Sequence, residues 1–244
     1  MSIIVTHISQ FGIVHAADSN LTFRSGKPAG TARKLFPVPS LKAAVTVAGN
    51  FSVGGKRMDC WMKRYIRKDR STQLRDFVQD LTNAINQRAT AEEKQEGYFL
   101  HVAGYVAMGA TPHPEFYHIT NYTIDKTTGG YSVLNANLTF SEDFWSQNSS
   151  IPASQLFLNH RGFIYCNGFP SGRIAYFQLL NNMASFKSQV WLNKSWQFRP
   201  PDNLVEEAEY LKHDMELIGL FFQYSNYSAP LIGGPIVYHT IASP

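Results

Sequence analysis

Three residues near the start of the chain combine a hydroxyl, an amine and a carboxylate at spacings that suit catalysis. Ser2 stands at the second position, Asp18 ends an apolar segment, and Lys34 opens another. If Met1 is removed, Ser2 carries both a hydroxyl and a free α-amine. An α-amine has a pKa near ~8, so close to neutral pH it can take a proton from the adjacent hydroxyl. A buried, charged lysine would then favour the alkoxide, and a carboxylate would hold that lysine in place.

The segments that must position these residues have the pattern of β-strands. Residues 3–8 and 12–17 are mostly apolar and are separated by a short turn, which predicts a β-hairpin that ends at Asp18. Residues 34–38 and 43–48 predict two further strands, the second of which stops at Gly49. Residues 20–31 contain Gly, Ser, Pro and Lys, a composition typical of a loop.

The remainder of the chain alternates between helical and strand patterns. Apolar residues at helical spacing predict four helices, at 56–67, at 74–85, from about Ser171, and after Asn203. Further strands are expected at 98–108, 115–123, 163–166 and 236–241. Residues 111–114 would interrupt the first of these strand pairs, and residues 125–152 predict an inserted loop or a decorated hairpin.

The order of elements indicates the fold class. Strands, two helices, strands, two helices and a final strand suggest two stacked sheets between helical layers. The chain contains no internal repeat and no linker. We therefore expect one α+β domain, a four-layer α-β-β-α sandwich, over residues 1–244.

Several segments share one family's pattern. They are Phe11-Gly12-Ile13-Val14-His15-Ala16-Ala17-Asp18, Lys34-Leu35-Phe36-Pro37-Val38, Val47-Ala48-Gly49, Leu100-His101-Val102-Ala103-Gly104-Tyr105 and Gly233-Gly234-Pro235-Ile236-Val237-Tyr238. They resemble the proteasome β-subunit family of N-terminal-nucleophile hydrolases, over nearly the whole chain. The resemblance places Ser2 where that family has its nucleophilic threonine, with Asp18 and Lys34 as its acidic and basic partners. It also assigns the backbone N–H of Gly49 to an oxyanion hole.

The chain departs from the family pattern at several positions. Asn20 stands where the family has arginine, Ile232 where it has serine, and Ala229 where it has aspartate. Ser171 and Ser228 are candidates to replace the missing supporting groups. These differences are typical of a divergent bacterial homologue of the proteasome.

The resemblance implies a ring of identical subunits that hydrolyses peptide bonds of unfolded polypeptides by acyl transfer. It implies no cofactor, and it leaves open whether an unfoldase is a partner. Two alternatives remain: a catalytically inactive scaffold subunit of such a ring, and an N-terminal-nucleophile amidase that acts on small amides.

Composition and charge narrow the classes of function and the compartment that we expect for this chain. The chain of 244 residues is 44% hydrophobic and 16% charged, with a formal net charge of +4. We expect a cytoplasmic protein with reduced, buried thiols at Cys60 and Cys166 and no secretory or membrane-spanning segment. The histidine spacing does not suit a metal site, and no nucleic-acid motif is present. A basic run favours a solvated helix face or a subunit contact over a polyanion surface; it comprises Lys56, Arg57, Lys63, Arg64, Arg67, Lys68 and Arg70.

Overall fold

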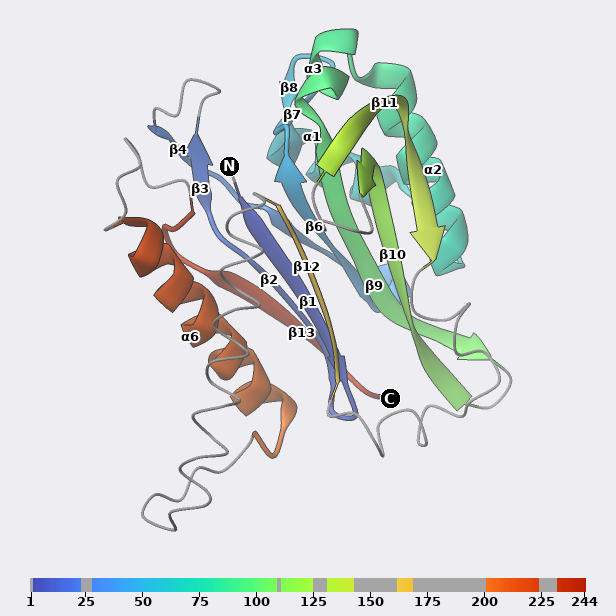
Figure 1. Cartoon of the computed structure of the whole chain (residues 1–244). Helices are drawn as coiled ribbons and strands as arrows, with labels where there is room; N and C mark the ends of the chain where they lie inside the picture. Colours follow the sequence, from blue (N-terminus) through green and yellow to red (C-terminus); the bar gives the residue numbers. More distant parts are fainter. Residues whose placement is uncertain are drawn as a thin grey trace.

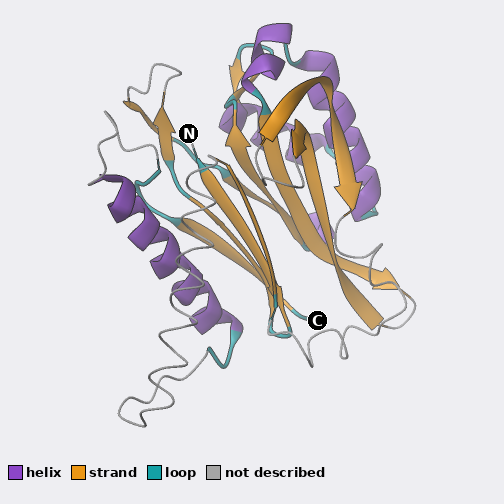
Figure 2. Ribbon diagram, in the orientation of Figure 1, coloured by secondary structure: helices purple, strands orange, loops and turns teal. Residues whose placement is uncertain are grey.

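Two antiparallel sheets form the centre of the protein, which is described by a computed structural model (Figure 1). The structure describes residues 2–22, 28–108, 111–124, 131–142, 162–168, 201–223 and 232–244. Within these residues the chain is of the α+β class, as Figure 2 shows. The expected helix from about Ser171 lies outside the described residues.

The first sheet carries the start of the chain. Its four strands lie in the order β12-β1-β2-β13, namely Phe163–Gly168, Ile3–Ser9, Gly12–Ala17 and Val237–Ala242. The predicted hairpin is confirmed, because β1 pairs with β2 from Ile4↔Ala17 to Ser9↔Gly12. Gly12 has a φ of +151°, and a Cβ there would lie 2.4 Å from the carbonyl oxygen of Ile241. The turn that starts β2 therefore needs glycine.

The second sheet has five strands in the order β11-β10-β9-β6-β5. They are Tyr131–Glu142, Thr111–Ile124, Tyr98–Met108, Ala43–Gly49 and Leu35–Val38. Successive side chains of β6 point to opposite faces of the sheet, so they pack alternately against the helices and against the other sheet. Val45 and Val47 belong to the hydrophobic cluster under the helices, whereas Ala44 and Ala48 join clusters shared with the first sheet. The small alanines let the two sheets approach.

Helices cover the outer face of each sheet. The helices α1, α2 and α3 are Met58–Lys68, Leu74–Arg88 and Ala91–Glu96, and α6 is Leu204–Gln223. The apolar residues of α1 and α2, among them Trp61, Phe77 and Leu81, pack on the five-stranded sheet. Those of α6 pack on the four-stranded sheet. Asn203 caps α6, since its Oδ1 accepts hydrogen bonds from the backbone N–H groups of Val205 and Glu206 at 3.1 and 3.0 Å.

Two short hairpins lie beside the sheets. They change two of the boundaries predicted from the sequence, those of the loop at residues 20–31 and of the helix at residue 56. Residues 20–31, expected to be loop, contain β3 (Asn20–Thr22) paired with β4 (Pro28–Thr31). The strands β7 (Ser52–Val53) and β8 (Lys56–Arg57) form the other hairpin. The helix expected from residue 56 therefore starts at Met58, because Lys56 and Arg57 belong to β8.

The expected interruption at residues 111–114 is wrong. The strand β10 runs through this segment and pairs with β9 from Thr111↔Met108 onward. Pro112 and Pro114 are tolerated because β11 pairs with β10 only from Tyr117 on, so within the described residues the prolines have a strand on one side alone. The strand β11 also lies inside the segment 125–152, which includes more regular structure than an inserted loop would have.

One carboxylate ties the β7–β8 hairpin to α3. Glu93 accepts hydrogen bonds from the backbone N–H groups of Gly54 and Gly55 at 2.7 and 2.9 Å and from the hydroxyl of Ser52 at 2.7 Å. It also completes the capping box of α3 with Thr90. The chain just beyond Gly49 is thereby anchored.

Candidate active site

Ser2, Asp18 and Lys34 meet in the interior. The Nζ of Lys34 donates to the Oγ of Ser2 at 2.7 Å and to the Oδ1 of Asp18 at 2.9 Å. Ser2 is 5% exposed, and solvent reaches neither Asp18 nor Lys34. The structure thus brings together the three residues selected from the sequence.

Backbone amides hold the carboxylate of Asp18. Its Oδ1 accepts from the N–H of Ile3 at 3.0 Å, and its Oδ2 accepts from the N–H of Gly233 at 3.4 Å. The first donor belongs to the residue that follows Ser2, so the carboxylate is positioned relative to the start of β1. The second comes from the segment that leads into β13. Charge-assisted bonds of this kind favour an ionised carboxylate.

Lys34 lies just before β5 and is held by three acceptors. The N–H of Val47 on β6 bonds to its carbonyl oxygen at 2.9 Å, which fixes its backbone. Its ammonium donates to Ser2, to Asp18 and to the carbonyl oxygen of Asn20. An ammonium has three hydrogens, and each of them has an acceptor here.

Burial and pairing act in opposite directions on the two charges. Burial lowers the pKa of Lys34 and raises the pKa of Asp18, while the attraction between the two groups opposes both shifts. The hydrogen bonds of Asp18 to Ile3 and Gly233 also lower its pKa. A buried pair in this balance has a lysine that is more acidic than one in water.

Gly168 on β12 packs directly against the backbone of Ser2. Its φ is +128°, and a Cβ there would lie 2.0 Å from the carbonyl oxygen of Ser2. The pairing Ile3↔Gly168 places it opposite the start of β1. Only glycine permits this approach, so β12 helps to fix the candidate nucleophile.

Gly49 ends β6 in the second sheet. Its neighbour Ala48 shares a buried cluster with Ile4, and Figure 1 shows the end of β6 and the start of β1 at the same end of the molecule. Gly49 has a φ of +87°, and a Cβ there would lie 2.4 Å from the carbonyl oxygen of Gly97. The next residue, Asn50, donates from its backbone N–H to that same oxygen at 2.7 Å. The turn after β6 is therefore fixed at the end of the molecule that holds Ser2.

Sequence reasoning missed the backbone groups of the site. The carbonyl of Asn20 and the N–H of Gly233 carry no side-chain signal, although the Gly233-Gly234 pair was noted. That pair is explained by close packing, since a Cβ on Gly234 would lie 2.5 Å from Oδ1 of Asn20 and 2.7 Å from Oγ of Ser19. The expected substitutes Ser171 and Ser228, together with Ala229, lie outside the described residues. Ile232 is fully buried among apolar residues under α6.

A second buried polar group lies between the sheets. The hydroxyl of Thr6 is 3.2 Å from Nδ1 of His15 and 3.1 Å from Nδ1 of His101. The Nε2 of His101 lies 2.6 Å from Oδ1 of Asn167, the neighbour of Gly168. Burial lowers the pKa of His15 to about 3 and that of His101 well below its usual value. Both rings are therefore neutral, and they join strands of the two sheets.

The prediction for the cysteines is confirmed only in part. The two cysteines are thiols, but only Cys166 is buried, whereas Cys60 is exposed. Cys60 is exposed because it faces away from the apolar side of α1. Among the described residues, no group of three or more His, Cys, Asp or Glu side chains could hold a metal ion. None of the described helices is long and apolar enough to span a bilayer.

No family model matches the chain, and no curated protein matches it significantly.

Proposed function

We propose that this protein is an N-terminal-nucleophile hydrolase that cleaves amide bonds, with Ser2 as the nucleophile once Met1 is removed. The observation that carries the proposal is the bond of 2.7 Å from the buried ammonium of Lys34 to the hydroxyl of Ser2. A buried cation beside a hydroxyl lowers the energy of its alkoxide. A serine that served only for packing would not need so costly a neighbour.

In the proposed reaction, Ser2 Oγ attacks the carbonyl carbon of an amide while its own α-amine accepts the hydroxyl proton. The carbon–nitrogen bond then breaks, and the α-amine returns the proton to the leaving amine. Water hydrolyses the resulting ester and regenerates Ser2. Lys34 stabilises the negative charge on the serine oxygen, Asp18 holds Lys34, and the N–H of Gly49 is proposed to stabilise the oxyanion.

The proposal extends to the fold type and the assembly. The arrangement of α1 and α2 on one sheet and α6 on the other supports a four-layer α-β-β-α sandwich of the N-terminal-nucleophile type. By the resemblance of the sequence to proteasome β-subunits, the subunits would form a ring that admits unfolded polypeptides. A hydrolase of small amides uses the same nucleophile and differs only in substrate.

Intact-mass analysis with a β-lactone probe tests the nucleophile. The expected result is a chain that has lost Met1 and carries one adduct, which peptide mapping places on Ser2. Ser2→Ala should prevent labelling. Ser19→Ala is the matched control, because Ser19 is also buried beside Asp18 and its hydroxyl lacks a hydrogen-bond partner in the structure as described.

The same experiment distinguishes the hydrolase from a catalytically inactive scaffold subunit. The apolar Ile232, which stands where the family has serine, favours the scaffold. A chain that retains Met1 has an acylated Ser2 nitrogen that cannot accept a proton. If folded protein keeps Met1 and takes up no probe, the hydrolase proposal fails and the scaffold function stands.

A further inference from the structure

Ser2 and the groups proposed to assist it belong to different sheets. Ser2 precedes β1 of the four-stranded sheet, whereas Lys34 precedes β5 and Gly49 ends β6 of the five-stranded sheet. Ala44 and Ala48 bring the sheets together through apolar contacts, which have no preferred direction. Apolar contacts alone would therefore not hold the two halves of the site to the precision that a nucleophile needs.

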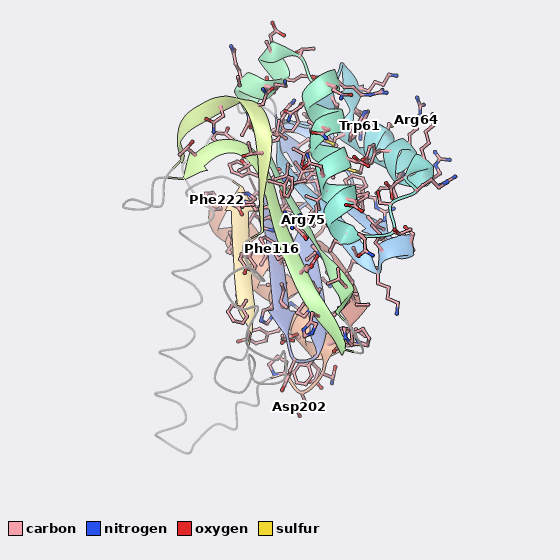
Figure 3. All side chains as sticks on the ribbon, turned by 90° about the vertical axis from the view of Figure 1, so that its right-hand side faces the viewer. Trp61, Arg64, Arg75, Phe116, Asp202 and Phe222 are labelled. Atoms are coloured by element: carbon pink, nitrogen blue, oxygen red, sulfur yellow. The ribbon has the colours of Figure 1, made fainter. Side chains whose placement is uncertain are left out.

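The strand β12 makes directional contacts between the sheets. Among the described residues it pairs with β1 alone. Its Tyr165 and Asn167 face the second sheet, because Cys166 between them packs under α6. Tyr165 stacks on Phe116 of β10, which Figure 3 labels, with ring centroids 3.8 Å apart. The Oδ1 of Asn167 lies 2.6 Å from Nε2 of His101 on β9. Stacked rings tolerate some sliding, whereas a contact of 2.6 Å between polar atoms does not.

The contact with Asn167 ends a chain of four polar contacts. The chain runs from the carbonyl oxygen of Ala103 to Nε2 of His15 at 3.3 Å, and from Nδ1 of His15 to the hydroxyl of Thr6 at 3.2 Å. It continues from that hydroxyl to Nδ1 of His101 at 3.1 Å and from Nε2 of His101 to Asn167 at 2.6 Å. The two oxygens at its ends can only accept. Burial keeps both rings neutral, so three hydrogens serve four contacts, one from each ring and one from the hydroxyl.

The distances decide which of the four contacts has no hydrogen. Two acceptors would repel each other at 2.6 Å, so Nε2 of His101 must donate to Asn167. Nδ1 of His101 then accepts from Thr6, and the oxygen of Thr6 accepts from Nδ1 of His15. The contact without a hydrogen is the one with Ala103, which at 3.3 Å is the longest. The three hydrogen bonds therefore all point toward Asn167, and aligned bonds of this kind strengthen one another.

We infer that His101 is a positioning residue for Ser2, which it holds in place through Asn167 and β12. The bond that His101 donates fixes Asn167 against the second sheet. The next residue, Gly168, lies opposite Ile3 and packs on the carbonyl oxygen of Ser2. One hydrogen bond thus connects the second sheet to the backbone of the candidate nucleophile. This role rests on the proposed function, because it matters to catalysis only if Ser2 reacts.

Two amide substitutions separate the two nitrogens of the His101 ring. His101→Gln places its amide where Nε2 lies and keeps a donor for Asn167, whereas His101→Asn reaches only to the place of Nδ1 and keeps the contact with Thr6. The second-order rate constant of β-lactone labelling should fall about tenfold or more in His101→Asn and stay within about threefold of the wild type in His101→Gln. The fall should lie in the acylation step and leave the dissociation constant of the probe unchanged, because the nucleophile is displaced and the binding surface is not.

A loss of stability alone would not give this pattern. Ile8→Ala is the matched control, because Ile8 is also fully buried between the sheets and lies on β1. It pairs with Phe163, at the end of β12 that is away from Gly168. We expect this variant to unfold at a lower urea concentration than the wild type and to label at the wild-type rate while it is folded. If His101→Asn does not fold, Asn167→Ala removes the same bond from the side of β12 and should show the same slow labelling.

Nitrogen-15 NMR of the histidine rings tests the direction of the chain without any probe. We expect the proton of His101 on Nε2 and the proton of His15 on Nδ1. A proton on Nδ1 of His101 and none on Nε2 would mean that the ring does not donate to Asn167, and the assigned role would then be wrong.

The labelling experiment also distinguishes the failure of this role from the failure of the hydrolase proposal. If the wild type is labelled on Ser2 and folded His101→Asn is labelled equally fast, His101 does not position Ser2 and the hydrolase proposal stands. If the wild type takes up no probe, the hydrolase proposal fails and the role of His101 fails with it.

Discussion

The ammonium of Lys34 lies 2.9 Å from the carboxylate of Asp18, and both side chains are completely inaccessible to solvent. An ion pair removed from water in this way gives up hydration that mutual attraction and hydrogen bonds only partly restore. Each partner is therefore tolerated only while the other is present, and their energetic coupling can be measured.

Lys34→Met should lower the free energy of unfolding by about 3–5 kcal/mol, because it leaves Asp18 buried and unpaired. Adding Asp18→Asn removes that charge, so the double variant should lose less stability than the sum of the single variants. Denaturant titration of the four chains gives the coupling energy. Strict additivity would contradict the structure. The β-lactone adduct should be lost in every variant that lacks Lys34.

Gly168→Ala should disturb the start of β1, since its Cβ would lie 2.0 Å from the carbonyl oxygen of Ser2. We expect labelling of Ser2 to fall about tenfold or more, because a small misplacement of a nucleophile has a large effect on rate. Gly30→Ala is the matched control. Gly30 also has a positive φ, +98°, but a Cβ there meets nothing within 4 Å. It should cost only backbone strain of about 1–3 kcal/mol and leave the labelling rate intact.

Acid should destabilise the protein through the histidines between the sheets. Burial lowers the pKa of His15 to about 3 from the usual 6.5, so the ring stays neutral in the folded state while the unfolded chain takes up a proton. Stability is then lost as the pH falls below about 6.5, by about 1.4 kcal/mol per unit for each such histidine. His239 lowers the pKa of His15 further, and His118 and His15 both lower the pKa of His101.

Urea unfolding between about pH 7 and pH 5 measures this slope. His101→Asn should make it shallower even if the variant is less stable overall, because the slope counts protons and not packing. His213→Asn is the control, since that side chain is 68% exposed. An unchanged slope in His101→Asn would show that this ring titrates normally.

A rise in pH should destabilise the protein through Glu207. Burial raises its pKa from 4.5 to about 7, and the hydrogen bond from Ser9 at 2.6 Å only partly opposes this. The folded state holds its proton above the pH at which the unfolded chain releases it. The stability that it contributes is complete below about 4.5 and is lost as the pH rises through about 7.

The free energy of unfolding of Glu207→Gln should therefore exceed that of the wild type by about 1–3 kcal/mol at about pH 8. It should also depend less on pH. Glutamine keeps an oxygen for Ser9 and cannot ionise. Glu216→Gln, on the exposed side of the same helix, should behave like the wild type. Thermal unfolding at several pH values measures both variants, and equal alkaline slopes in all three chains would argue against a buried acid.

The candidate site was largely predictable because its side chains stand at the ends of recognisable strands, Ser2 and Asp18 at the β1–β2 hairpin and Lys34 just before β5. The hairpin fixes Asp18 relative to Ser2, and the strand pattern at Lys34 is clear in the sequence. The supporting groups were not predictable. Gly168 and Gly233 come from distant segments and act through close approach or a backbone N–H, for which residue type gives little signal.

The fold was predictable to a similar depth. Helical periodicity located α1, α2 and α6, and apolar runs located the strands of both sheets except β11. The errors arose where tertiary pairing overrides local signals. Pro112 and Pro114 suggested a break, yet they lie in a strand because that part of β10 needs its N–H groups on one side only. Asn20 to Thr31 looked like loop because a two-stranded pairing of short polar segments has no apolar pattern.

The three bonds of the Lys34 head group have one more consequence. With Ser2, Asp18 and the carbonyl of Asn20 all occupied, this cation has no hydrogen left over for an incoming molecule. It can influence bond cleavage as a stationary positive charge, but it cannot hand a proton to a departing group unless one existing bond is first broken. Another group must therefore transfer protons at this site. The nitrogen of Ser2 itself is the group that the proposed reaction uses.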